Sequence, residues 1–287
     1  MTPTLVRQHA ELAGPATRVE VDPRARARDW AEIQERMLVP LYEAVHERLE
    51  VGHGTRVLAL GCGSGLALLM AASRGAAVTG VDPSSPERLA LARRRLQPEA
   101  WGTRARADAR VLARVLDGPV DDLTDVSGTG TPAYTVVTAF EPIGCLAGDS
   151  AALAGQLTTA APLAERGAPV VLAGWGPPER CATSSVVRAV VRPADPPAAL
   201  RDGLEEVARS AGLRPDGSGR VSCPFGYAGL DSAVRGMLST GLFDAAIATS
   251  DEDQVGKELT EALHTHQRPD GTVWMSNVFR YLIARTT

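Results

Sequence analysis

The sequence predicts an α/β protein built on a doubly wound, mostly parallel sheet. Two observations lead to this fold class. Short apolar segments alternate with helical segments from about residue 56 to residue 175. The first apolar segment, residues 56–60, ends in a turn that contains Gly61, Gly63 and Gly65, and a helical pattern begins at Leu66. A strand, a tight glycine turn and a helix form the first half of a βαβ unit, and glycine at such a turn lets a ligand approach bare backbone.

Composition narrows the classes of function. The chain has 287 residues and a net charge of −4, and it contains no basic block, so nucleic acid is not expected as a partner. No apolar run approaches the roughly 20 residues of a membrane helix, and no secretion signal is evident. The four cysteines lack any C-x-x-C spacing, which argues against zinc or a disulfide framework and favours the reducing cytoplasm. We therefore expect a cytoplasmic protein that is a monomer or a homodimer and holds no metal.

The chain is expected to form a flexible extension over residues 1–28 and one domain over residues 29–287. Within that domain, residues 29–55 predict helices, because Trp30, Ile33, Met37 and Leu41 recur at helical spacing. Asp29 could cap the first helix, and Pro40 predicts a kink or the start of a second helix. This segment either forms a lid over the site or packs on the sheet.

The remaining elements follow from alternating patterns. The next strands are expected at residues 76–81, 103–107, 134–140 and 168–173, with helices at 86–96 and 149–164. Residues 56–175 form the predicted binding core. Residues 176–287 predict a helical cap with further strands, the last of them a long strand at 272–284.

Acidic residues follow two of the predicted strands. Asp82 ends the second strand, about 20 positions after the first glycine of the turn, where a carboxylate can bind both hydroxyls of a ribose. The alternative is that Asp82 caps the next helix together with Ser84 or Ser85. Asp108 closes the weak third strand, and it could accept a hydrogen bond from an adenine amine or cap a helix.

At this point the chain resembles the class I S-adenosylmethionine-dependent methyltransferases of the small-molecule type. The resemblance lies in V-L-A-L-G-C-G-S-G at residues 57–65, V-T-G-V-D at 78–82 and Asp108-Ala109. It continues with V-V-T-A-F before Glu141, the strand that ends at Trp175, and F-R-Y-L-I-A at 279–284. It implies a Rossmann-like sheet of seven strands whose last strand is antiparallel, with S-adenosylmethionine as the cofactor. A nicotinamide dehydrogenase fits less well, because G-x-G-x-x-G would need a glycine where Leu66 stands.

The resemblance also implies site residues. Gly61, Cys62 and Gly63 would pass the methionine part and ribose of the cofactor, and Asp82 would hold the ribose. Pro83, Asp108 and Ala109 would surround the adenine, and Phe140 would lie near the sulfonium. Two positions depart from the family pattern: Ala59 stands where an acidic residue is usual, and Tyr134-Thr135 replaces an aromatic–Asp pair.

Candidates for chemistry and acceptor binding come from the residues themselves. Glu141 and His46 are the candidate bases, although a solvated glutamate and a helix-surface histidine are the alternatives. Trp175, Phe225, Tyr227 and Met237 could line an apolar acceptor pocket or pack the core instead.

Three functions remain open at this point. The first is methyl transfer to a small organic metabolite of specialised metabolism. The second is a different reaction on the same fold, such as cyclisation or rearrangement. The third is the role of a non-catalytic partner subunit.

Overall fold

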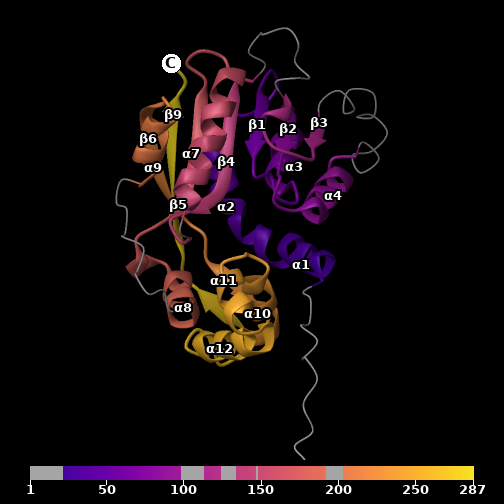
Figure 1. Ribbon diagram of the computed structural model, residues 1–287, viewed down its shortest axis with the longest axis vertical. Helices are drawn as coiled ribbons and strands as arrows, with labels where there is room; N and C mark the ends of the chain where they lie inside the picture. Colours follow the sequence, from indigo (N-terminus) through magenta and orange to yellow (C-terminus); the bar gives the residue numbers. More distant parts are fainter. Residues whose placement is uncertain (1–21, 98–112, 124–133, 147, 192–202) are drawn as a thin grey trace, which may run out of the picture.

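The computed structural model describes residues 22–97, 113–123, 134–146, 148–191 and 203–287. A seven-stranded sheet forms its centre, with the strand order β3-β2-β1-β4-β5-β9-β6 (Figure 1). All neighbours from β3 to β5 are parallel, whereas β9 is antiparallel to both β5 and β6. The expected seven-stranded, mostly parallel sheet with an antiparallel last strand is therefore confirmed. The strands are β1 Arg56–Leu60, β2 Ala77–Val81, β3 Ala113–Leu116, β4 Val136–Ile143, β5 Pro169–Trp175, β6 Arg214–Ser222 and β9 Val278–Arg285.

Helices cover both faces of the sheet. On one face, α2 (Val39–Arg48), α3 (Leu66–Ser73) and α4 (Pro86–Arg95) pack through Leu41, Leu68 and Leu89. On the other face, α7 (Asp149–Ala160) and α9 (Gly203–Ser210) pack through Leu157 and Val207. Because β1, β4 and β5 are apolar towards both layers, their sequences are nearly continuous apolar runs, as expected for buried parallel strands.

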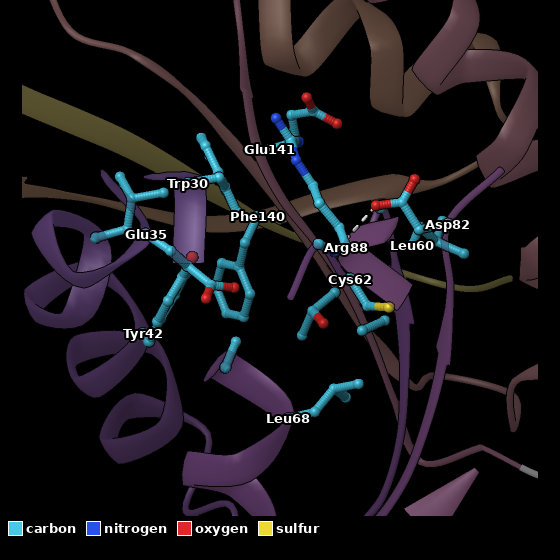
Figure 2. Close-up of a pocket in the computed structure, with 16 residues that line it drawn as sticks. Trp30, Glu35, Tyr42, Leu60, Cys62, Leu68, Asp82, Arg88, Phe140 and Glu141 are labelled. Carbon is cyan, nitrogen blue, oxygen red and sulfur yellow. Dashed lines mark hydrogen bonds between the residues drawn. The ribbon is translucent and has the colours of Figure 1, made fainter. Parts of the chain in front are cut away.

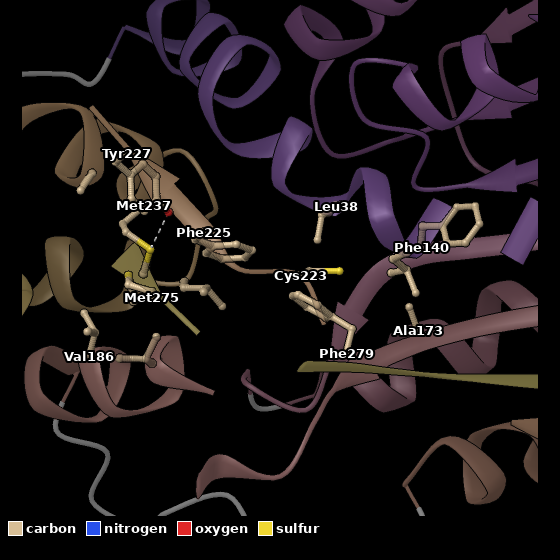
Figure 3. Close-up of a cluster of buried hydrophobic side chains, with 14 of the residues drawn as sticks. Leu38, Phe140, Ala173, Val186, Cys223, Phe225, Tyr227, Met237, Met275 and Phe279 are labelled. Carbon is tan, nitrogen blue, oxygen red and sulfur yellow. Dashed lines mark hydrogen bonds between the residues drawn. The ribbon is translucent and has the colours of Figure 1, made fainter. Parts of the chain in front are cut away.

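A smaller lobe lies beyond the end of the sheet (Figure 1). It consists of α8 (Ala182–Val191), α10 (Leu230–Leu238), α11 (Asp244–Thr249), α12 (Glu252–His264) and the antiparallel pair β7 (Phe225–Tyr227) and β8 (Val273–Met275). Its apolar residues continue into the core of the sheet, and Figure 3 shows Phe225 and Phe279 on the path between the two. The continuous core makes the lobe an integral part of the fold.

The lobe corrects one expectation about the last strand. Residues 272–284 form two strands, β8 and β9, because the chain bends at Ser276 and Asn277. The buried Asn277 accepts a hydrogen bond through Oδ1 from the Thr183 backbone N–H (3.1 Å), and its backbone carbonyl accepts one from the Cys223 N–H (2.9 Å). The bend therefore connects α8 and β7 to the sheet.

The segment before α2 also differs from expectation. The first helix, α1 (Pro23–Asp29), begins at Pro23, because Asp22 caps it by accepting from the Arg24 N–H (2.9 Å). Asp29, the expected cap, is its last residue. A π-helical turn η1 (Trp30–Gln34) and a 3-10 turn η2 (Glu35–Leu38) follow, and Pro40 lies in the first turn of α2. Ion pairs Arg26–Asp244 and Asp29–Arg235 connect α1 to the lobe.

Two further expectations concern the third strand and membrane-spanning helices. The strand expected at residues 103–107 lies outside the described residues, and the strand that pairs with β2 is β3, at Ala113–Leu116. Within the described ranges, no helix has the length and apolar character needed to cross a bilayer.

Candidate functional site

The glycine turn between β1 and α3 has the geometry that its sequence predicts. Gly61, Gly63 and Gly65 have φ values of 60°, 56° and 81°, which side-chain-bearing residues rarely adopt. The third glycine also allows close packing, because a Cβ at Gly65 would lie 2.9 Å from the Cβ of Ala92 in α4. The turn is thus fixed against its neighbours, and none of its three glycines has room for a side chain without a close contact.

Asp82 connects this turn to the end of β2. Its Oδ2 accepts a hydrogen bond from the Gly63 N–H (3.0 Å), and its Oδ1 accepts from the backbone N–H of Ser84 (2.9 Å) and from the Ser84 hydroxyl. The next helix is capped by Ser85, which accepts from the Arg88 N–H (3.2 Å). Asp82 therefore does not cap α4, and its two oxygens keep lone pairs that a ligand hydroxyl can use.

A small cavity lies above the turn, at the carboxyl ends of β1, β2 and β4 (Figure 2). Most of the residues expected around the cofactor line it: Gly61, Cys62, Gly63, Asp82 and Phe140. Such a place at the switch point of a doubly wound sheet is where these folds bind ligands. The structure therefore brings these five predicted residues together.

Glu35 is a lining residue that sequence reasoning missed. Its buried carboxylate accepts a hydrogen bond from the Ser64 hydroxyl and, through Oε1, from the Leu66 N–H (3.3 Å) at the start of α3. It also forms an ion pair with Arg95 (2.5 Å). A carboxylate of the chain itself therefore occupies the positive end of the α3 dipole.

Trp30 and Arg88 fill much of the remaining space. The Arg88 guanidinium lies over the Trp30 ring at 4.3 Å from its centroid and donates to the Ser239 carbonyl (2.6 Å). The buried Trp30 Nε1 has no hydrogen-bond partner in the described structure, and it would lie 3.2 Å from a Cβ at Gly63. The small cavity consequently measures only about 20 Å³.

A larger cavity of about 240 Å³ adjoins the small one. The two cavities share Trp30, Leu38, Leu60, Gly61 and Glu141 as lining residues. The larger cavity extends between the end of the sheet, α7 and the lobe. Of the residues expected in an acceptor pocket, Trp175 and Phe225 line it.

Tyr227 and Met237 line neither cavity and are buried in the lobe. The Tyr227 hydroxyl donates to Oε1 of Gln34 (2.9 Å), which in turn lines the larger cavity. Tyr227 therefore contacts a lining residue of the larger cavity, Gln34, and Met237 contacts the Tyr227 hydroxyl through its sulfur.

Glu141 lies where the two cavities meet. Its side chain keeps access to solvent, and no hydrogen bond or ion pair engages its carboxylate within the described ranges. Desolvation by the surrounding protein, and then the negative charge of Asp82, raise the pKa of Glu141, while Arg88 opposes the rise. A carboxylate with a raised pKa in a cleft is suited to accept a proton.

Other expected site residues lie elsewhere. His46 is buried in α2 and lines neither cavity; its ring packs edge-on against Phe140 at 6.0 Å. Burial lowers the pKa of His46 to about 4, and the charge of Arg74 contributes to this. Pro83 is exposed and lines neither cavity. Asp108 and Ala109 lie outside the described residues.

Metal and thiol chemistry receive no support from the described part of the chain. No cluster of three or more His, Cys, Asp or Glu residues there could hold a metal ion. The four cysteines are free thiols. Burial raises the pKa of Cys62, the one that lines the small cavity, so this thiol stays protonated at neutral pH.

Comparisons with known proteins agree with this geometry. Residues 58–124 match a family model described as a methyltransferase domain. No curated protein matches the sequence.

Solved structures with the same fold include a proposed methyltransferase from Bacillus halodurans. It is 14% identical to this chain with a TM-score of 0.52, and the alignment covers 85% of this chain and 97% of that protein. YcgJ from Bacillus subtilis is 16% identical with a TM-score of 0.52, over 86% of this chain and 98% of that protein. YjhP from E. coli is 19% identical with a TM-score of 0.52, over 92% and 99% respectively.

These findings establish the fold. Residues 58–124 match a methyltransferase domain, and the chain has the class I S-adenosylmethionine-dependent methyltransferase fold. The domain match also supports S-adenosylmethionine as the cofactor.

Proposed function

We propose that the protein transfers a methyl group from S-adenosylmethionine to a small organic acceptor in the larger cavity. One observation carries the proposal: a cavity at the glycine turn and Asp82 adjoins a second, mainly apolar cavity, with Gly61 and Glu141 lining both. A group-transfer enzyme needs two such adjoining sites, because the donor and the acceptor atoms must meet in line.

The residues of the small cavity fit the cofactor. A Cβ at Gly61 would lie 3.3 Å from Oε2 of Glu141, and one at Gly63 would lie 3.2 Å from Trp30, so a side chain at either position would narrow the cavity further. Asp82 would hold the ribose hydroxyls, and Phe140 would lie beside the methionine part. At about 20 Å³ the cavity is smaller than the cofactor, and Trp30, Glu35 and Arg88 are lining side chains whose displacement would enlarge it.

The chain's own contribution to the reaction is alignment and proton removal. The cofactor, when bound, supplies a methyl group that its sulfonium has already activated. Gly61 lets donor and acceptor approach across bare backbone, and the apolar walls of the larger cavity exclude water. Glu141, with its raised pKa, would take up the proton that an amine or hydroxyl acceptor releases.

Calorimetry with S-adenosylmethionine tests the cofactor site. We expect binding to the wild-type protein and a loss of about 10-fold or more in Asp82→Asn, because a hydrogen bond to a charged group contributes about 1.5–3 kcal/mol. Asp253→Asn, an exposed acid on α12, is the matched control and should bind like the wild type. Equal affinities in all three proteins would contradict the assignment.

A second candidate is a reaction without methyl transfer, such as cyclisation or rearrangement. Ala59 in place of an acid, together with the small volume of the cavity lined by Trp30, Glu35 and Arg88, favours it. Mass spectrometry separates the two candidates: methyl transfer adds one methyl mass to the acceptor and releases demethylated cofactor, whereas the alternative converts substrate without either product. A protein that converts no substrate yet forms a stable complex with a second protein would be a partner subunit instead.

A further inference from the structure

The larger cavity has mainly apolar walls, and the described charged residues that line it are all negative. Its apolar lining comes from the end of the sheet, from α7 and from the lobe, and it includes Ile143, Leu146, Leu153, Trp175, Phe225, Leu242 and Phe279. The charged residues that line it are Glu141 and Asp149, and no described arginine, lysine or histidine is among them. Gln34, Gln156 and Thr240 complete its polar groups. A ligand therefore meets an apolar wall and negative charge.

The two acids are in different situations. Oδ2 of Asp149 accepts hydrogen bonds from the backbone N–H groups of Gly144 (2.7 Å) and Leu146 (3.1 Å), so this carboxylate is engaged in its own turn. Glu141 has no such partner in the described part of the chain. An ionised carboxylate in a cleft is stabilised when a cationic donor pairs with it.

Arg88 is the one cation among the charges that act on Glu141, but no ion pair joins the two side chains in the described structure. Arg88 lines the small cavity only, where it stacks on Trp30 and donates to the Ser239 carbonyl. Asp82 and Asp149 add negative charge around Glu141, which raises the cost of ionising it. Asp82 and Arg88 line the small cavity only, so the described charges that line the larger cavity are those of Glu141 and Asp149.

We propose, on the basis of the methyl transfer suggested above, that the acceptor is a predominantly apolar molecule with a basic amine, for which Glu141 is the counter-ion. The amine nitrogen would lie at the junction of the cavities, and the apolar body would contact Trp175, Phe225 and their neighbours. The same charges disfavour acceptors with a carboxylate or phosphate, because no described cation lines the larger cavity to receive them.

Three probes with one skeleton test this charge preference: 4-phenylbutylamine, 4-phenylbutan-1-ol and 4-phenylbutyrate. Their dissociation constants are measured with the full chain, without cofactor, at pH 7.5 and about 0.1 M salt. We expect the amine to bind at least about 10-fold more tightly than the carboxylate, with the alcohol between them. In Glu141→Gln the ratio should fall to about two-fold or less, and circular dichroism verifies the fold of the variant.

Glu43→Gln, which removes the same charge from an exposed position on α2, is the matched control and should keep the wild-type ratio. Equal or tighter binding of the carboxylate overturns the proposal. So does an amine preference that survives in Glu141→Gln, or a failure of the amine to bind at millimolar concentration. Because the measurement needs no cofactor, absent methyl transfer with an intact amine preference would reject the proposed function alone.

Discussion

His46 gives the sharpest test of how burial affects a titratable group beside the site. His46 is 1% exposed, its Nδ1 has no partner among the described residues, and its pKa is lowered to about 4. Folding therefore favours the neutral imidazole. The stability that this contributes is fully present above the unfolded pKa of about 6.5 and is lost as the pH falls towards 4.

The magnitude follows from the two pKa values. Their difference corresponds to roughly 3 kcal/mol in total, of which about 2 kcal/mol is lost at pH 5. Urea unfolding at pH 8 and pH 5 should show this loss in the wild-type protein and a loss smaller by about 2 kcal/mol in His46→Leu. His264→Gln, at an exposed histidine of α12, should behave like the wild type. If His46→Leu is as sensitive to acid as the wild type, burial does not lower the pKa of His46 and the reasoning is refuted.

Two further substitutions test the glycine turn and the buried carboxylate of Glu35 beside it. Gly65→Ala should lower the free energy of unfolding by about 1–3 kcal/mol more than Gly54→Ala. Both glycines have positive φ, but only at Gly65 would the added Cβ lie 2.9 Å from the Cβ of Ala92. Equal losses in urea unfolding would refute the packing argument. Glu35→Ala should cost about 2–4 kcal/mol by leaving Arg95 and Ser64 without their buried partner, whereas the exposed Glu43→Ala should change stability by less than about 0.5 kcal/mol. A loss below about 1 kcal/mol in Glu35→Ala, measured the same way, would show that the carboxylate is dispensable.

Much of the sheet could be predicted because its strands are buried on both faces. Such strands have nearly continuous apolar sequences, and their ends are marked by glycine or acid, as at Gly61 and Asp82. The position of Asp82 beside the turn also follows from the parallel pairing of β1 with β2. Local patterns were sufficient for these features.

The side chains that fill the small cavity could not be predicted in this way. Glu35 points inward after the π-helical turn at Trp30–Gln34, which shifts the helical phase, and no residue pattern indicated that turn. Arg88 lies on a helix where charged residues normally face solvent, and its position depends on Trp30 and Ser239, which are distant in sequence. The bend at Asn277 likewise depends on its contact with Thr183.

The position of β9 has a consequence for how the chain assembles. β9 lies between β5 and β6, about 100 residues after β5 in the sequence, and β6 pairs with no other strand of the described sheet. Until β9 docks, the edge of β5 is open and β6 has no partner strand in the described sheet. Pairing over such a distance is slow, and an open β5 edge can pair with another chain. Folding yield should therefore be limited by the arrival of the last strand, long after the glycine turn has formed.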